Sequence, residues 1–587
     1  MPKIDVKNPR DIWKRYEAGR TYNESINLYA GVETYEKFYA GDQWGNLEVT
    51  EIEKPVLNRI TRPVNTMVAN ITSDDAIINL SPSLPSEEDE NYLRGVKDEI
   101  DRIREQANMQ AKRRRAVRNA AVDGDTMAYL YWDTEIKTGQ QETGDVVIEL
   151  HENTRALFGN PNSSDVQTQP YIIIVTRRYI DDVRAEAEAN GMSHEDAERT
   201  IKADEAGGLG ETNTETSLVT RLIYLYRDIE SKTIHAVIST ANAIIKEDVD
   251  TKLRLYPVAW MCWQEARQSY HGVSAVHSII NLQILLNKQL AEQNRCLQFY
   301  AWPKVIYNST VIPKWDNRIG KNIPVNGPVD RAYSQILPGA DVSASVMQSM
   351  QLLSTGMMDS IGVNDAAMGQ LNIDNTSAII AQQEAATIPL NLQRQAYYEF
   401  EEQIVRIILD YLRVNAGVRY VPYSAEKLSD MAEDAIGNAL NGGEIPRTLS
   451  DPAIANIDMI GTETDPANAP EGTRPIDFSR LNDLAYKLTV DVGSGSMWSE
   501  ISENNTLEAL YRNQIIDGRD LLSSIPRRFI GGKRDTLLKS YDRRQRQMQS
   551  PAPEPGGGDI VDRTGATGTS QKTDNAKRYI SQLSPEI

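Results

Sequence analysis

The sequence predicts a mixed α+β fold that is divided into several domains. The chain has 587 residues, a length that suits about three to five domains. Segments with an apolar residue every three or four positions, typical of helices, alternate with short runs rich in β-branched and aromatic residues, typical of strands. Hydrophobic residues make up 40% of the chain and charged residues 25%, as in folded proteins.

Helices and strands are interspersed in the first part of the chain. Helices are expected at residues 24–42, 58–70, 88–122 and 179–204. The helix over 88–122 is the clearest, because its apolar residues recur on one face. We expect Gly41 to close the first helix and Asp123-Gly124-Asp125 to end the third. Strands are expected at residues 126–133, 146–150, 171–176, 218–226 and 233–238.

A second pattern begins at Val273, where a helix over 273–300 would be about 42 Å long. One stripe of this helix is apolar. A second stripe is small or polar but uncharged, and it consists of Gln283, Asn287, Ala291 and Asn294. Prolines then break residues 301–340 into a compact strand-and-turn module. Because so small a module cannot bury many aromatic rings, we expect a docking surface there, with Trp302, Tyr307 and Trp315 as candidates.

The remaining elements are a nearly uncharged helix, a loop and a second long helix. The helix covers residues 341–360, and the Gly/Asn/Asp-rich loop covers 362–375. The long helix is expected over 376–414, with a kink at Pro389. A loop-like stretch at 441–476, a strand at 488–492 and helices within 505–546 follow, and low-complexity sequence begins near Ser550.

Catalytic and cofactor motifs fit this sequence poorly. His271 and His277 have the wrong spacing for a zinc-protease helix, which needs two histidines four apart with a glutamate between them. Residues 529–534 (FIGGKR) lack the first glycine and the final hydroxyl of a phosphate-binding loop. No metal or cofactor is therefore expected. The most apolar stretches are too short to span a bilayer, so no membrane partner is expected either.

A basic run on the helix at 88–122 has two interpretations. It contains Lys112, Arg113, Arg114, Arg115 and Arg118. Such a run can contact nucleic acid, or it can form a solvated or subunit-pairing face. The net charge of −20 argues against general coating of DNA, because phosphate contacts need clustered Lys and Arg.

Several motifs in this order resemble the portal proteins of tailed bacteriophages, in particular the short-tailed-phage type. The motifs are YAGDQW at 39–44, KPVLNRI at 54–60, AAVDGD at 120–125, FGNPNS at 158–163, YHGVS at 270–274 and DVGSGS at 491–496. In the fourth, Asn160 stands where the family usually has Asp. The resemblance covers most of residues 25–545.

The resemblance implies a portal fold with an α/β wing, a two-helix stem, a small β-containing clip, a long kinked helix and a helical crown. An N-terminal arm (1–24) precedes the wing, which comes from 25–272 and 415–495. The stem helices are 273–300 and 341–361, and the clip is 301–340. A tunnel loop at 362–375 and the kinked helix at 376–414 follow. The crown is 496–546, and 547–587 is a disordered tail.

The resemblance also implies a function. Portal proteins form a ring of about twelve copies at one capsid vertex, through which double-stranded DNA is packaged and ejected. They dock the terminase large subunit and head–tail adaptor proteins, contact capsid and scaffold proteins, and assemble in the host cytoplasm before residing in the virion. They carry no enzymatic activity, since ATP hydrolysis belongs to the terminase. The clip aromatics would then contribute to docking.

Two questions about the DNA path stay open at this point. The tunnel-loop residues Asp365, Gln370, Asn372 and Asp374 are the candidates for meeting DNA, because weak or repulsive contacts let a polyanion slide. The Gln283/Asn287/Asn294 stripe either faces DNA or hydrogen-bonds a neighbouring subunit. Two alternative functions remain: another structural virion protein without a channel, and an enzyme such as a nuclease with an unrecognised carboxylate group.

Overall fold

The computed structural model describes most of the first 492 residues and seven positions beyond them. The described ranges are 5–45, 53–73, 76–84, 86–140, 143–204, 218–301, 304–316, 318, 321–331, 334–337, 344–362, 388–422 and 473–492, together with 507, 510–512, 518, 521 and 541. The chain divides into two compact units, residues 1–496 and 497–587. The elements below belong to the first unit.

Both helices and strands are abundant, so the mixed fold class predicted from the sequence is confirmed. The α-helices are α1 (Pro9–Ser25), α2 (Leu28–Ala40), α3 (Thr61–Ile71), α4 (Glu87–Gln106), α5 (Met109–Asp123), α6 (Ile180–Ala189), α7 (His194–Thr200), α8 (Ile280–Ala301), α9 (Ala344–Ser360) and α11 (Asn391–Asn415). Short 3₁₀ turns are η1 (Asn153–Arg155), η2 (Val166–Thr168), η3 (Val329–Arg331), η4 (Ile388–Leu390) and η6 (Phe478–Asn482).

The strands form antiparallel sheets of different sizes. They are β1 (Ala76–Pro82), β2 (Asp125–Asp133), β3 (Asp145–His151), β4 (Ala156–Phe158), β5 (Tyr171–Tyr179), β6 (Leu218–Arg227), β7 (Ile234–Ser239), β8 (Ile244–Asp250), β9 (Val258–Cys262), β10 (Lys304–Tyr307), β11 (Ser334–Leu337), β12 (Val418–Pro422), β13 (Thr473–Asp477) and β14 (Tyr486–Val492). The largest sheet has the order β4-β5-β6-β7-β8, and a three-stranded sheet has the order β3-β2-β9. The pairs β1–β14, β10–β11 and β12–β13 each make a two-stranded sheet.

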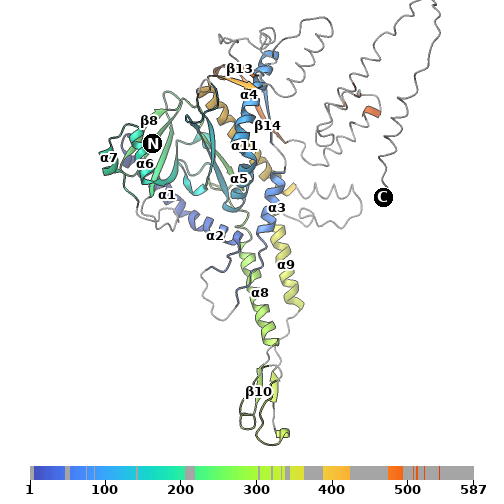
Figure 1. Cartoon of the computed structure of the whole chain (residues 1–587). Coiled ribbons are helices and arrows are strands. Elements are labelled where there is room, and N and C mark those ends of the chain that lie inside the picture. Colours follow the sequence, from blue (N-terminus) through green and yellow to red (C-terminus); the bar gives the residue numbers. More distant parts are fainter. Residues whose placement is uncertain are drawn as a thin grey trace, which may run out of the picture. The chain divides into compact units, whose positions relative to one another are not determined.

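A helix-covered body surrounds the main hydrophobic core. This core joins α3, α4 and α5 to the three-stranded sheet and to α11, whose inward face is apolar along most of its length. A smaller core lies where α1 packs on the five-stranded sheet, and a third lies where α6 and α7 pack on that sheet. Figure 1 shows these elements together, with α11 beside α4 and α5.

Both helix ends predicted from glycine are confirmed, but the helices predicted over 88–122 and 179–204 are each divided in two. Gly41 caps α2 with φ +99° and Gly124 caps α5 with φ +103°, conformations that glycine adopts without strain. The prediction of one helix over 88–122 was wrong. Asn108 lies between α4 and α5 with φ 52°, so the chain turns there, and each helix then presents its own apolar face to the core.

Two predicted helix starts also differ from the structure. The helix expected from Val273 begins at Ile280, because residues 270–274 are held by the side-chain and backbone bonds described below. The helix expected to pass through Pro389 begins after it. Pro389 is the middle residue of η4, and α11 starts at Asn391. Proline lacks the N–H that an interior position requires, which suits it to a helix start. Residues 376–387 lie outside the described part.

The strands predicted at 126–133, 146–150, 171–176, 218–226, 233–238 and 488–492 are confirmed within β2, β3, β5, β6, β7 and β14. The sequence pattern did not indicate the strands β1, β4, β8, β9, β12 and β13. Most of β8 is exposed and charged at the sheet edge, and β4 has only three residues, so neither gives a clear period-two pattern. Most of the loop-like stretch predicted at 441–476 falls outside the described residues.

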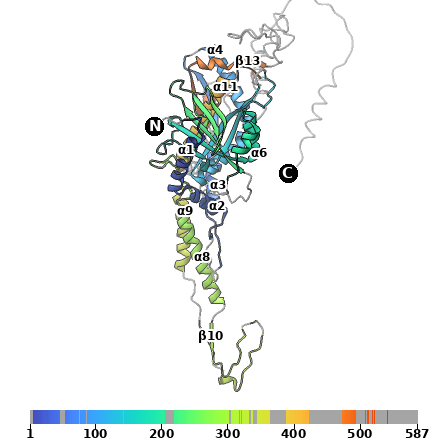
Figure 2. The same ribbon diagram turned by 90° about the vertical axis from the view of Figure 1, so that its left-hand side faces the viewer.

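Two helices leave the body side by side. In Figures 1 and 2, α8 and α9 run together away from the sheets, and β10 lies beyond the end of α8. Gln289 Nε2 of α8 donates to Ser349 Oγ of α9 (3.1 Å), and Gln293 Nε2 contacts Met347 Sδ at 3.1 Å. The β10–β11 hairpin connects the two helices along the chain. The expected order of helix, strand-containing module and helix is therefore present.

Candidate functional site

The polar stripe of α8 binds the main chain of an extended segment, residues 53–60, which we call the anchor segment. Gln283 Oε1 accepts from the backbone N–H of Arg59 (3.1 Å), and Gln283 Nε2 donates to the carbonyl of Leu57 (2.8 Å). Asn287 Oδ1 accepts from the N–H of Leu57 (3.3 Å) and from Gln283 Nε2 (2.9 Å). The two carboxamides thus pair with backbone groups that have no strand neighbour.

The stripe extends this attachment in both directions along α8. Asn287 Nδ2 donates to Gln43 Oε1 (2.7 Å), and Gln43 Nε2 donates to the carbonyl of Phe38 (3.0 Å), which ties the helix to the end of α2. Further along, Asn294 donates to the Glu53 carboxylate, and Gln298 Nε2 donates to the same carboxylate (3.1 Å). One face of α8 is therefore attached to the anchor segment over about four turns.

This arrangement differs from both sequence-based alternatives for Gln283, Asn287 and Asn294. Gln283 is fully buried and Asn287 is 2% exposed, and their amides bond within the same chain. Within this chain the two amides therefore already bond to backbone and side-chain groups. Asn294 is half-buried, and its amide is held by Glu53. The sequence does contain the partner of this stripe, the KPVLNRI segment. When such a segment is extended and has no neighbouring strand, its backbone N–H and C=O groups need other hydrogen-bond partners.

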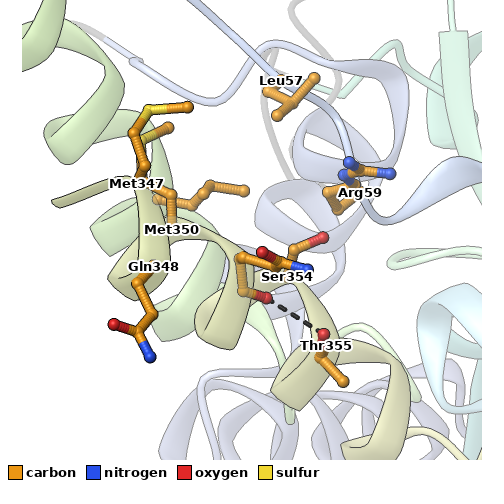
Figure 3. A pocket seen from close by; sticks show the side chains of 9 residues that line it. Leu57, Arg59, Met347, Gln348, Met350, Ser354 and Thr355 are labelled. Carbon is orange, nitrogen blue, oxygen red and sulfur yellow. Dashed lines mark hydrogen bonds between the residues drawn. The ribbon is translucent and has the colours of Figure 1, made fainter. Parts of the chain in front are cut away.

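A groove of about 500 Å³ lies between the anchor segment and α9. Figure 3 shows Leu57 and Arg59 on one side and Met347 and Met350 of α9 on the other. The remaining lining residues are Leu286, Gln348, Gln351, Ser354 and Thr355. The lining contains no carboxylate, histidine or cysteine, so this groove lacks the groups that general acid–base catalysis uses.

Residues 270–274 form a junction that connects α8 to three parts of the body. The buried Tyr270 hydroxyl lies 3.1 Å from Asn23 Oδ1 of α1 and 3.1 Å from the carbonyl oxygen of Ala156 in β4, and its single proton can be donated to either acceptor. The N–H of Gly272 donates to Asp125 Oδ2 (2.8 Å) at the start of β2. A Cβ on Gly272 would lie 2.4 Å from the carbonyl oxygen of Gly124, so only glycine fits this backbone crossing.

The junction also contains a buried His–Asp pair. His271 Nδ1 lies 2.9 Å from Asp125 Oδ2, and His271 Nε2 lies 3.2 Å from Asn23 Oδ1. In a hydrolytic triad the second ring nitrogen would face a hydroxyl or thiol nucleophile. Here it faces a carboxamide, which is not nucleophilic, and His271 is only 3% exposed. The pair therefore positions the chain that leads into α8.

The basic run on α5 is partly used inside the chain. Lys112 Nζ donates to the carbonyl of Ile148 (2.5 Å), and burial lowers its pKa. Arg118 forms a two-pronged ion pair with Glu36 of α2, and its guanidinium lies 4.8 Å from the Tyr39 ring centre. The other members of the run differ in exposure: Arg113 is half-buried, and Arg114 and Arg115 are exposed. The run is therefore not a single continuous basic surface.

Asp123 lies at the end of α5 beside this ion pair. Burial raises the pKa of Asp123 to about 8, and the negative charge of the neighbouring Glu36 adds to the rise. Its Oδ1 atom is buried without a hydrogen-bond partner. The folded chain therefore keeps a proton on Asp123 at neutral pH, whereas the unfolded chain releases it near the ordinary pKa of about 3.9.

This raised pKa makes folding stability pH-dependent. Between about pH 4 and pH 8 the folded state binds more protons than the unfolded state, so the contribution of Asp123 to stability is full at low pH and is lost as pH rises through this window. We expect Asp123→Asn to raise the unfolding midpoint in urea relative to the wild type, with a gain that grows from pH 5 to pH 8.

The matched control for this pH experiment is Asp181→Asn, which changes an exposed carboxylate in the first turn of α6. Its difference from the wild type should stay small and should not grow with pH. A gain for Asp123→Asn that is equal at both ends of the window would contradict a buried, protonated Asp123.

The remaining candidate residues lie in the hairpin module, meaning the described residues of 304–337 around β10 and β11, and in the loop that the sequence predicts after α9. Tyr307 of β10 and Trp315 stack with ring centres 5.5 Å apart. Both rings are half-buried, so part of each remains accessible. Trp302 lies outside the described residues. The loop candidates Asp365, Gln370, Asn372 and Asp374 also lie outside them.

Among the residues that the structure describes, no group of three or more His, Cys, Asp or Glu side chains is placed to hold a metal ion. Within the same described ranges, no helix combines the length and apolar character that crossing a bilayer requires.

Comparison with known proteins assigns the chain to a family. The family model for phage P22-like portal proteins matches residues 14–413, more than half of the chain. A search of curated proteins gave no match. The matched range contains the anchor segment, the junction, α8, the hairpin module and α9, so every attachment described for α8 lies inside it. The chain belongs to the P22-like phage portal protein family.

Proposed function

We propose that this portal protein forms a ring around a channel through which double-stranded DNA is packaged and ejected. The family supports a portal role in the virion. In this proposal α8 and α9 are the stem within 273–300 and 341–361, and the hairpin module is the clip (301–340). Residues 362–375 are the tunnel loop, and α11 (Asn391–Asn415) is the helix behind it. The wing comes from 25–272 with 415–495, and the crown from 496–546, with 1–24 and 547–587 as terminal segments.

The observation that supports a channel best is the charge pattern of α9, one of the two proposed stem helices. Helix α9 has 17 residues and one charged side chain, Asp359. A wall that passes DNA must avoid holding phosphates, and a nearly uncharged helix meets that need because it offers no Lys or Arg for ion pairing. Attachment of α8 to the anchor segment also gives the stem a fixed base from which repeated copies can be arranged around an axis.

The proposal implies several partners. A ring of about twelve copies would sit at one capsid vertex, in contact with capsid and scaffold proteins. The clip would dock the terminase large subunit and head–tail adaptor proteins. Assembly in the host cytoplasm would precede residence in the virion. The P22-like portal family is structural, which favours a conduit over the nuclease alternative.

Electron microscopy of the purified full chain tests this proposal. We expect closed rings with a central opening wide enough for a duplex. A structural virion protein without a channel would instead give monomers, filaments or a ring without such an opening. A magnesium-dependent DNA cleavage assay on the same sample should remain blank, and reproducible cleavage would favour the nuclease alternative.

The tunnel loop provides a second, functional test. Replacing Asp365 and Asp374 with Lys should leave rings intact but reduce genome packaging by about tenfold or more, because added cations would hold DNA phosphates. Packaging is measured as DNase-protected DNA. A matched double replacement by Asn removes charge without adding cations and should have a smaller effect. Normal packaging by the Lys double variant would contradict a loop that meets DNA.

A further inference from the structure

Exposed apolar side chains gather around the hairpin module, which we define as the described residues of 304–337. Within it, Ile306 is 53% exposed and Val329 is 76% exposed. The end of α8 that leads into the module adds Leu297, Phe299 and Tyr300, the last of which is 63% exposed. Large apolar side chains left exposed on and beside one small module indicate a candidate interaction site.

The hairpin module has little core of its own. Its sheet consists of four residue pairs between β10 and β11. Among the module residues whose burial is described, Ile312 alone is buried, at 3% exposure. An isolated two-stranded hairpin is marginally stable in water, so contact with a partner would contribute to its order.

The charge of this region is opposite to that of the whole chain. Residues 301–340 contain five basic and two acidic side chains, whereas the chain has a net charge of −20. Of the two acids, Asp316 is already bonded to Arg318 (2.8 Å) and Lys321 (3.2 Å). Lys304 and Lys314 are both exposed.

Cations and aromatic rings are interleaved at the base of the module. Arg295 and Lys304 each lie over the Phe299 ring, at 5.8 and 5.7 Å from its centre. The stacked rings of Tyr307 and Trp315 add a second aromatic surface whose two members fix each other's orientation. Rigid aromatic anchors beside exposed cations are typical of protein-binding surfaces, where such residues contribute most of the affinity.

We propose that the hairpin module binds acidic segments of a protein partner, whose apolar side chains cover Ile306 and Val329. This inference rests on the proposed function, because there the module is the clip and each copy in the ring repeats the same basic and apolar surface. Repetition around the ring would strengthen the attraction for an acidic partner, since weak sites that act together give high avidity.

The same observations favour an acidic protein over two other occupants. Duplex DNA would use the lysines, but its surface is mostly phosphate and sugar and offers no extended apolar face to cover Ile306 and Val329, and its stacked bases are closed to Tyr307 and Trp315. A second copy of the module would bring its own excess of basic side chains against Lys304 and Lys314, and like charges at an interface cost several kcal/mol.

Fluorescence anisotropy with assembled full-length rings tests the inference. The probe is a labelled amphipathic peptide of Glu and Leu, of about 20 residues so that it can form a helix on binding. A peptide with Lys in place of Glu and a DNA duplex of similar length serve as comparison probes. We expect the acidic peptide to bind at least about tenfold more tightly than the basic one, with an affinity that falls as salt rises.

Three variants identify the surface that binds the peptide. Lys304→Glu with Lys314→Glu should weaken binding of the acidic peptide by about tenfold or more. Ile306→Ser with Val329→Ser should weaken it by about fivefold, because apolar contact is lost. The matched control Lys246→Glu changes an exposed lysine on β8, in the body, and should leave the affinity unchanged.

Each outcome either supports or overturns the inference. Equal affinity for acidic and basic peptides, insensitivity to both module variants, or displacement of the peptide by duplex DNA would overturn it. Self-association of isolated rings through the module, lost in the same variants, would assign the surface to a second copy instead. Rings are checked by microscopy in every sample, so intact rings without peptide binding overturn this inference alone, whereas absence of rings overturns the proposed function.

Discussion

Replacing Arg419 with Met should destabilise the body of the protein by about 3–5 kcal/mol, the cost of breaking a buried ion pair by removing one partner. Arg419 is fully buried. Its Nη1 lies 2.8 Å from Glu99 Oε1, and its Nη2 donates to the carbonyl of Gly144 (2.7 Å). The guanidinium also lies 5.0 Å from the Trp132 ring centre.

The cost should be large because the acids remain when the arginine is removed. Glu99 and Asp145 are 1% and 3% exposed, and both also bind Arg102, at 2.7 and 2.9 Å. In Arg419→Met one half-buried guanidinium would have to neutralise two buried carboxylates. Methionine fills a similar volume, so the variant isolates lost charge from lost packing.

Urea unfolding followed by tryptophan fluorescence measures the effect. The matched control is Arg406→Met, which removes an ion pair of 2.5 Å with Glu402 one turn away on α11, where both side chains are substantially exposed. The control should lose about 0.5 kcal/mol or less. A loss below about 1 kcal/mol for Arg419→Met would mean that the buried network contributes little to stability.

Replacing Gln283 with Leu should release the anchor segment from α8. The change leaves the N–H of Arg59 and the carbonyl of Leu57 without their partners, and each buried unsatisfied polar group costs about 1–3 kcal/mol. Leucine fills about the same space as the Cβ, Cγ and Cδ atoms of glutamine, so side-chain packing along α8 should be kept. We therefore expect local opening of residues 53–60 rather than global unfolding.

Limited trypsin digestion reports this opening at one peptide bond, Arg59–Ile60. Lowering the local opening free energy by about 2 kcal/mol should speed cleavage roughly 30-fold. The neighbouring Lys54 and Arg62 precede proline, which protects their bonds, so the fragment that ends at Arg59 is specific. The control Asn281→Leu changes an exposed position on the same helix and should leave the rate unchanged. Equal cleavage of both variants would show that Gln283 does not hold the segment.

The candidate site was predicted less well than the fold because its contacts join distant parts of the chain. The uncharged stripe on α8 was visible in the sequence, but its partners Leu57 and Arg59 lie more than 220 residues away. Local periodicity shows that a face is polar without showing which backbone it satisfies. In the same way, the basic run at 112–118 gave no sign that Glu36 and Ile148 would bind two of its members.

The sequence alone determined the elements whose shape depends on nearby residues. Gly41 and Gly124 end their helices because a left-handed residue is cheap only for glycine, and the apolar spacing of α4 and α11 marks the faces that enter the core. Three features depended on the tertiary structure alone. The first is the position of the turn between α4 and α5, and the second is the late start of α8, after residues 270–274. The third is the burial of Arg419 between two carboxylates. Those outcomes depend on packing and charge compensation between remote segments, which no local pattern in the chain records.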